Sequence, residues 1–353
     1  MRKYEIDMTR HKPVVIESDD WGACEYTADP EMQKTYLEIL KKYGRQDEAS
    51  YTTLESTADL ERLYSLLESH TDCRGRHPVF TSYTCMGNPD FDAIRANGFT
   101  EYVDIPIDKG FPSMWQRPGV IEKYLEGEKR GVWRAEYHAM LHHTSPKLWL
   151  EKVRDGEFER ALFDLQNYYL LYHLPEYDGY NLREQHAMIA EGFNRFKRIF
   201  GRLPSCCVTS DAYPETEILW SALGATSIAL INCRVNSGET VVYPTKPWNM
   251  QNIYGRLGDY NEKEDISYLT RNAFMEWGCT EEQIIAAAKR SWEVYHEPVI
   301  ISSHRGNYCN FKPGAADAHY ERLDRVLTIL ESLGAEYTTS AELGNAYRLG
   351  TEF

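Results

Sequence analysis

The sequence lacks several patterns that would assign a protein to a class at once. None of its eight cysteines forms a C-x-x-C pair, and a chain of 353 residues does not need disulfide bonds to fold. It has no run of about 18 apolar residues, so we expect no span across a bilayer. It also has no internal repeat, no low-complexity tract and no linker rich in Pro, Gly or Ser. These absences exclude disulfide scaffolds, membrane-spanning proteins and repeat arrays, and they favour reduced, mostly buried thiols.

Positive charge is scarce. The chain has 39 Lys and Arg against 54 Asp and Glu, a formal net charge of −15, and its pI is near 5.3. Nucleic acid and anionic membranes both attract basic proteins, so we expect neither as a partner. The first residues, Met1 to Asp7, lack the apolar stretch of a secretory signal. We therefore expect a cytoplasmic protein, or one whose leader has been removed; the oligomeric state is left open.

Strand-like apolar runs alternate with helix-like segments along the whole chain. The strand-like runs cover residues 13–17, 77–82, 101–106, 131–137, 205–209, 227–232, 239–243, 266–270, 298–302 and 335–338. The helix-like segments cover residues 31–43, 58–69, 118–128, 146–154, 157–171, 182–200, 215–223, 281–296 and 316–333. Strands separated by helices indicate β-α crossovers and hence a mostly parallel sheet wrapped by helices.

The number of these units favours closure of the sheet. We predict an α/β protein: a distorted (β/α) barrel of about seven or eight parallel strands. We expect a single domain over residues 1–353, with a helical insertion or lid around 146–200. In such barrels chemistry is done where strands end and the next loops begin. The residues directly after each predicted strand are therefore the candidates for a site.

Two adjacent carboxylates follow the first predicted strand, within Ser18-Asp19-Asp20-Trp21-Gly22. Neighbouring carboxylates at the end of a buried strand repel each other and resist desolvation, and a cation beside them would relieve both costs. The alternative is an ordinary capping or turn pair.

Three of the eleven histidines, His138, His142 and His143, lie within six residues after the strand at 131–137. Imidazoles four residues apart can reach a common point, and they suit zinc, cobalt or nickel. The zinc-protease pattern H-E-x-x-H is absent. The alternative is a set of surface histidines at a helix start, and His143 competes with His142 for the second ligand position.

His304 follows the strand at 298–302. A histidine there suits a general acid or base, because its ordinary pKa lies near neutrality. Taken singly, a packed histidine explains this position equally well.

The order of these three motifs resembles the polysaccharide deacetylases (NodB-homology group), the family 4 carbohydrate esterases. The resemblance implies a deacetylase-type barrel in which Asp19 is the catalytic base and Asp20 is the metal carboxylate. It also implies that His138 and His142 are the metal histidines and that His304 is the general acid protonating the leaving group. The implied cofactor is a divalent metal, first of all Zn²⁺, with Co²⁺ or Ni²⁺ as alternatives.

The sequence also departs from the family pattern. Trp21 stands directly after the Asp pair, where the family has Gly, and Ala139 replaces the hydroxyl residue expected after the first histidine. The family's Arg-Pro-Pro stretch has no clear counterpart, and the nearest segment, 206–214, contains no arginine. Arg271, directly after a predicted strand, is the candidate to supply that charge.

We therefore expect a divergent metal-dependent hydrolase that removes an N- or O-acyl group, such as acetyl, from a carbohydrate. The expected mechanism is metal-activated water with an Asp base and a His acid. One alternative is a glycoside-hydrolase-like metal barrel, which needs two carboxylates ~5–9.5 Å apart; Glu17 and Glu136 are candidates without an evident pairing. The other is a non-catalytic carbohydrate-binding protein with a vestigial site.

Sugar rings stack on aromatic faces, and aromatic residues make up 13% of the chain. Trp21, Trp115 and Trp133 are candidates to line a saccharide groove, although most such rings belong to a core.

Overall fold

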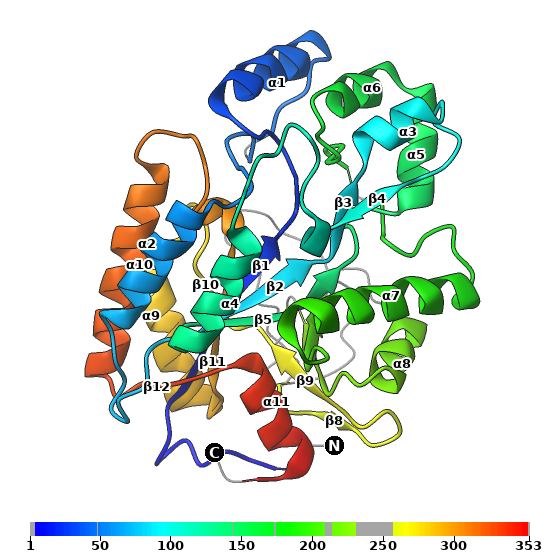
Figure 1. Cartoon of the computed structure of the whole chain (residues 1–353). Helices are drawn as coiled ribbons and strands as arrows, with labels where there is room; N and C mark the ends of the chain where they lie inside the picture. The colour runs from blue at the N-terminus through cyan, green and yellow to red at the C-terminus, as the bar shows by residue number, and fades with distance from the viewer. Residues whose placement is uncertain are drawn as a thin grey trace.

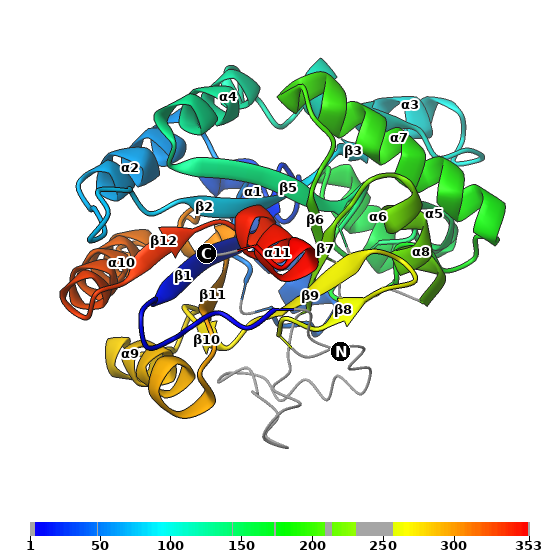
Figure 2. The same ribbon diagram turned by 90° about the horizontal axis from the view of Figure 1, so that it is seen from below.

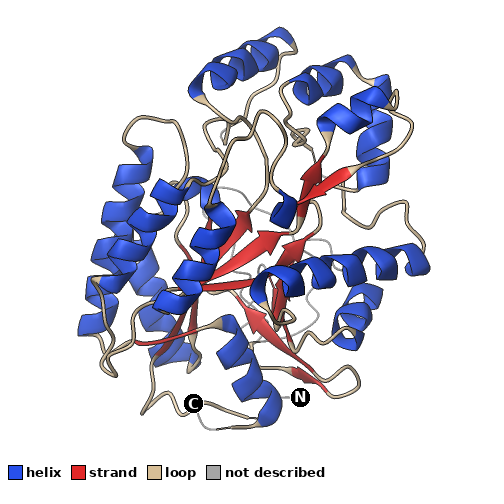
Figure 3. Cartoon of the chain, viewed as in Figure 1, coloured by secondary structure: helices blue, strands red, loops and turns tan. Residues whose placement is uncertain are grey.

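The computed structural model describes residues 4–47, 49–142, 144–172, 174–208, 214–230 and 257–351. Its centre is a sheet of mostly parallel strands with helices packed around it (Figures 1 and 3). This confirms the predicted α/β class and the mostly parallel sheet. The predicted strand at 239–243 and residues 209 and 231–232 lie outside the described residues.

The main sheet has the strand order β10-β11-β1-β2-β5-β6-β7-β9-β8, and β12 also pairs with β1. All of its ladders are parallel except β8 with β9. Its strands are β1 (Pro13–Trp21), β2 (Phe80–Cys85), β5 (Trp133–Ala139), β6 (Cys206–Val208), β7 (Ser227–Leu230), β8 (Tyr260–Asn261), β9 (Ile266–Thr270), β10 (Ala273–Phe274), β11 (Val299–His304) and β12 (Glu336–Thr338).

The segment 101–106, expected among the parallel strands, does not join the main sheet. Only β4 (Asp104–Pro106) is extended, and it pairs antiparallel with β3 (Gly87–Pro89) as a small separate sheet. A local apolar pattern cannot tell a strand of the main parallel sheet from a strand of a small antiparallel sheet, because it carries no information about which strand it pairs with.

The helices form an outer layer around the sheet and an upper group beyond the strand ends (Figure 1). The outer core lies between the sheet and residues of α2, α4, α7, α9 and α10. A second core joins α1, α3, α5 and α6. The helices are α1 (Pro30–Lys42), α2 (Thr57–Glu68), α3 (Phe91–Ala96), α4 (Val120–Arg130), α5 (Pro146–Asp155), α6 (Glu157–Asp164), α7 (Leu182–Phe200), α8 (Pro214–Ala222), α9 (Glu281–Arg290), α10 (Ala315–Ser332) and α11 (Ser340–Leu349).

Helix α11, which the sequence pattern did not predict, lies near the centre of the view from below and packs against β7 and β9 (Figure 2). Its Leu343 and Tyr347 share a core with Val15 of β1 and Leu269 of β9. The sheet is therefore covered on both faces, which explains why its strands read as continuous apolar runs.

The two ends of the strand order come together along the chain. Strands β9 and β10 stand at opposite sides of the sheet, yet only Arg271 and Asn272 separate them in sequence. The sheet therefore curls until β10, at one edge, and β9, next to the other edge, are joined by a two-residue link. No ladder between them occurs in the described residues, and a closed barrel stays a prediction, as does the single domain with an insertion at 146–200. Within the described ranges, no helix is long and apolar enough to cross a membrane.

Candidate metal centre

Two backbone bulges shape the ends of β1 and β5. Between β1 and β2, Ser18 pairs with Ser82 and Trp21 with Thr84, so Asp19 and Asp20 together oppose one residue. Between β5 and β2, His138 is likewise the extra residue. A bulge re-aims the side chains around it and is frequent beside active sites. Asp20 adopts a left-handed φ of 73°, which an Asp tolerates better than most residues.

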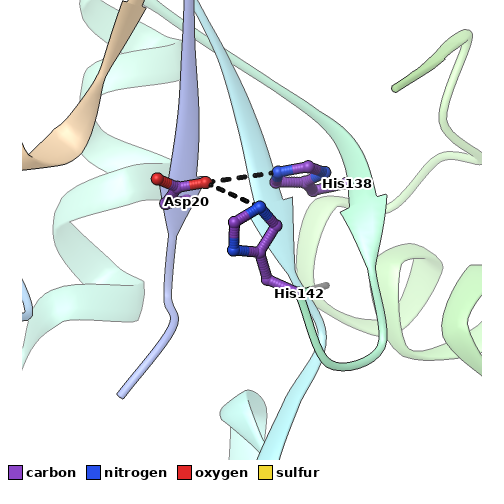
Figure 4. A group of neighbouring side chains, drawn as sticks. All are labelled: Asp20, His138 and His142. Atoms are coloured by element: carbon purple, nitrogen blue, oxygen red, sulfur yellow. Dashed lines mark hydrogen bonds and ion pairs between the residues drawn. The ribbon is translucent and has the colours of Figure 1, made fainter. Parts of the chain in front are cut away.

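Asp20, His138 and His142 converge at this end of the sheet (Figure 4). The Oδ1 atom of Asp20 lies 3.3 Å from Nε2 of His138 and 3.2 Å from Nε2 of His142. His138 is the second-to-last residue of β5, and His142 lies in the loop that follows the strand, so the four-residue spacing acts through a loop rather than a helix. Both imidazoles are buried. His143, the competitor for the second position, lies outside the described residues.

The second nitrogen of each imidazole has an acceptor of its own. Nδ1 of His138 donates to the carbonyl of Val208 at 3.0 Å, and Nδ1 of His142 lies 2.8 Å from Oε1 of Glu25. A carbonyl only accepts, so Nδ1 of His138 carries a proton, and an ionised Glu25 requires the same of His142. Nε2 is then the ligating atom of both rings, a common arrangement in metal sites.

Three electronegative atoms face one another at this point, and a positive charge between them would remove their repulsion. Burial alone raises the pKa of Asp20, but His142, His304 and His138 hold it well below its usual value. Burial lowers the pKa of His142 to about 3 despite the opposing Asp20. Burial also opposes the charge of His138, whose pKa is nevertheless raised by its hydrogen bond to Asp20. A divalent cation bound at this point would take the place of any proton shared between His138 and Asp20.

The spacing of the donors fits a small divalent cation. Two donors of a tetrahedral zinc, each ~2.0–2.1 Å from the ion, are about 3.3 Å apart. The separations of 3.3 and 3.2 Å from Asp20 to the two histidines match that value. Ligand atoms of the three residues all lie within 4.8 Å of one another. This group could therefore hold a metal ion, and its two nitrogens and one oxygen suit zinc, cobalt or nickel.

Asp19 lies beside the centre but faces a different partner. Nη1 and Nη2 of Arg271 each donate to one oxygen of its carboxylate at 2.6 Å, and Nε donates to Glu17 at 2.6 Å. Burial alone raises the pKa of Asp19, but Arg271 lowers it below the usual value. Arg271 belongs to the link between β9 and β10, so the curl of the sheet brings it to β1. The guanidinium of Arg271 therefore lies against Asp19, and its role as the charge that segment 206–214 lacks stays a prediction.

His304 ends β11 directly beside Asp19, its partner in the parallel register. Nε2 of His304 lies 3.8 Å from Oδ2 of Asp19, and Nδ1 lies 2.8 Å from Oε1 of Glu276. Burial alone lowers the pKa of His304, but Glu276, Asp20 and Asp19 raise it to about 10. One third of its side chain is exposed (33%), against 2% for His138 and 8% for His142. The raised pKa of His304 favours its charged form at neutral pH, and its side chain is the most exposed of the three imidazoles.

The tryptophans expected to line a saccharide groove are in the interior instead. Trp21, Trp115 and Trp133 are at most 2% exposed. Trp21 packs edge-on against Trp133 at 4.7 Å between ring centroids. The bulge explains this position: it shifts the alternation of β1, so Trp21 joins Val14 and Ile16 in the outer core.

Sequence reasoning missed two carboxylates that hold the site histidines, Glu25 and Glu276. Glu25 lies five residues after Asp20, and Glu276 lies two residues after β10. The position of Glu276 past a strand end was a usable signal, since functional groups gather there. Glu25 had no such signal, because its contact with His142 depends on the path of a loop.

Comparison with known proteins gives a likeness of structure only. No family model and no curated protein sequence matches the chain. A probable polysaccharide deacetylase from Pseudomonas aeruginosa PAO1 aligns with 97% of this chain and 92% of its own, at 10% identity and a TM-score of 0.47. Puue allantoinase aligns with 97% of this chain and 91% of its own, at 9% identity and a TM-score of 0.47.

The 4-alpha-glucanotransferase from Thermococcus litoralis aligns with 94% of this chain at 9% identity and a TM-score of 0.45, and this chain spans 40% of its length. Other similar structures include a putative polysaccharide deacetylase from Mycobacterium smegmatis and a peptidoglycan deacetylase from Bacillus subtilis. At such low similarity, the function of this chain has to follow from its own site residues.

Proposed function

We propose that this chain is a metal-dependent hydrolase that removes an N- or O-acyl group, most simply acetyl, from a carbohydrate. The observation that carries the proposal is the convergence of the donor atoms of Asp20, His138 and His142 beside Asp19 and His304. Binding a metal needs only the first three residues. A carboxylate and a charged imidazole next to them supply the proton acceptor and proton donor that a hydrolysis requires.

Asp20, His138 and His142 would hold the cation, with Zn²⁺ favoured and Co²⁺ or Ni²⁺ as alternatives. When bound, a divalent cation supplies Lewis-acid polarisation of an acyl oxygen and makes water at the site more acidic. Three protein ligands leave room for water and substrate, unlike the four of a closed structural site.

Asp19 is the base that takes a proton from the attacking water. Arg271 accounts for one lone pair on each carboxylate oxygen, and a carboxylate has about four such positions. Oδ2 also lies 3.8 Å from Nε2 of His304, whose side chain is one third exposed. Arg271 therefore fixes the direction of the carboxylate and keeps it ionised, so that it is ready to accept a proton.

His304 is the acid that protonates the departing nitrogen or oxygen. Its raised pKa keeps it charged before the reaction, and Glu276 holds its other nitrogen. An amine anion is too poor a leaving group to depart unassisted, so proton donation at Nε2 is required for amide cleavage.

A carbohydrate substrate is what the resemblance of the motif order to the polysaccharide deacetylases implies. A glycosidase is disfavoured, because both candidate carboxylates are engaged in the interior. Glu17 is fully buried and accepts hydrogen bonds from Arg271, Tyr83 and Ser340. Glu136 is also fully buried, and it accepts from the backbone N–H groups of residues 205 and 206.

The test is an assay on an acetylated oligosaccharide with the Zn²⁺-loaded protein, scoring acetate and new reducing ends separately. We expect acetate without reducing ends, and loss of both bound metal and acetate release in Asp20→Ala and His142→Ala. The control is His11→Ala, which removes a histidine that pairs with Glu336 beyond the amino end of β1 and should keep the metal. Reducing ends would indicate a glycosidase, and retention of sugar without either product would indicate a binding protein.

A further inference from the structure

The loop after β1, residues 22–26, is fixed by buried side chains from distant parts of the chain. They are Glu55, Asn88, Asn167 and Arg305. Asn88 accepts from the N–H of Cys24 at 2.7 Å and donates to the carbonyl of Gly22 at 2.8 Å, while Glu55 accepts from the N–H of Gly22 at 2.9 Å. A loop anchored at successive residues leaves its side chains little freedom of position.

The side chain that this loop directs inward is Glu25. It is 2% exposed, and its Oε1 accepts from Nδ1 of His142 at 2.8 Å. The hydroxyl of Tyr168 donates to the same oxygen at 3.4 Å. On the far side of the ring, Nε2 of His142 lies 3.2 Å from Asp20. Glu25, His142 and the candidate cation position therefore form a line across one imidazole.

The charge of Glu25 has a buried counter-charge. Nη2 of Arg305 lies 3.7 Å from Oε2 of Glu25, and Nη1 lies 3.6 Å from Oε2 of Glu55. Arg305 is fully buried and also donates to the carbonyl of Ala23. A buried carboxylate is retained as an anion only where such a partner offsets its desolvation.

The two candidate metal histidines therefore differ in their outer partners. His138 donates to the neutral carbonyl of Val208, whereas His142 donates to an anionic carboxylate. A carboxylate behind a ligating imidazole fixes its tautomer and orientation and makes the ligand more basic.

We propose that Glu25 is a positioning residue of the metal centre: it holds His142 with Nε2 toward the cation and strengthens the affinity of the site for divalent metal. This inference rests on the proposed function, since it requires a cation at Asp20, His138 and His142. Loss of such an outer partner typically weakens metal binding about 10- to 100-fold.

The test compares Glu25→Gln and Glu25→Ala with the unaltered protein. Dissociation constants for Zn²⁺ and Co²⁺ are measured by competition with a chromophoric chelator, alongside the Co²⁺ absorption spectrum and the melting temperature without metal. Glu25→Gln keeps an acceptor for Nδ1 and removes only the charge, so we expect about a 10-fold weaker affinity. Glu25→Ala removes both, and we expect about 100-fold together with a changed Co²⁺ spectrum.

The matched control is Glu336→Gln. Glu336 is also buried and accepts from a histidine, Nδ1 of His11 at 3.1 Å, but it pairs with the opposite end of β1. This variant should bind both metals as the unaltered protein does. If Glu25→Gln lowered the melting temperature without metal yet bound both ions normally, Glu25 would be a structural residue and the inference would be wrong. The proposed function would survive that result, whereas a failure of the unaltered protein to bind either ion would overturn both.

Discussion

Replacing Arg271 with Met is the sharpest test of the electrostatics beside the metal centre. The side chain of Arg271 is 1% exposed and donates to two carboxylates, Asp19 and Glu17, through three hydrogen bonds of 2.6 Å. Methionine fills a similar volume without charge. The variant therefore leaves two buried carboxylates without their counter-charge while it creates little empty space.

The expected cost follows from that burial. Removing one partner of a buried ion pair typically costs about 3–5 kcal/mol of the free energy of unfolding. A large domain loses about 2 °C of melting temperature per kcal/mol, so the expected drop is roughly 6–10 °C at neutral pH.

The deficit also has a defined pH dependence. With Arg271 present, the pKa of Asp19 is lowered, so its contribution to stability is present at neutral pH and is lost as the pH falls. Without Arg271, burial raises the pKa of Asp19, and its penalty is largest at neutral pH and shrinks as protonation removes the charge. The difference between variant and unaltered protein should therefore become smaller from pH 7 to pH 5.

The assay is thermal unfolding followed by circular dichroism at both pH values. Arg130→Met is the control, because Arg130 also contacts several carboxylates but its side chain is 20% exposed. Ion pairs nearer the solvent contribute about 0–1 kcal/mol, so this variant should melt within about 2 °C of the unaltered protein. Equal losses in the two variants, or a deficit at Arg271 that grows toward pH 5, would refute the reasoning.

Three further predictions concern the site and its loop. Asp19→Asn should keep its Zn²⁺ and lose about 100- to 10,000-fold in turnover, measured as acetate release with metal content in parallel; wild-type turnover would mean that Asp19 is not the base. In the protein without metal, His304 should titrate by NMR near pH 10, and Glu276→Gln should lower that pKa. The charge of His304 then stabilises the fold fully below about pH 6.5, and this stabilisation is lost as the pH rises through about 10. A titration of His304 near pH 6.5 would contradict the assigned contacts. Gly22→Ala should lower the free energy of unfolding by about 1–2 kcal/mol in chemical denaturation. Gly22 has a φ of 78°, and an added Cβ would lie 3.1 Å from the carbonyl oxygen of Cys85. Unchanged stability would show that this turn relaxes freely.

Most of the fold could be predicted because its signals are local. Helix α7 (Leu182–Phe200) begins at an Asn cap and ends before a Gly, and its predicted bounds coincide with the observed ones. The core strands were visible as apolar runs, since both faces of the sheet are buried. Helix α11 was missed, although Thr339 and Glu342 form a capping box at its start. No local sequence pattern could predict whether the sheet closes into a barrel, because closure depends on pairing between strands that are distant in the sequence.

The residues of the candidate site could be predicted from the sequence in part, whereas most of their contacts could not. Asp20 and the histidines stood out because unusual residue types follow strand ends, and the structure brings them together. Which partner each group finds was mostly invisible, because the contacts join residues more than a hundred positions apart, as for Glu25 with His142. Arg271 was placed by its position after a strand, and its contact with Asp19 depends on the curl of the sheet. The inward turn of Trp21 depends on one extra residue in β1, which sequence alternation alone does not reveal.

The left-handed backbone of Asp20 has an evolutionary consequence. Glycine and asparagine accept this conformation at least as readily as aspartate, and each is one nucleotide change away from an aspartate codon. Either replacement would remove the anionic donor and spare the architecture around it. A descendant of this protein could therefore lose the proposed metal site in a single mutational step while it remained folded.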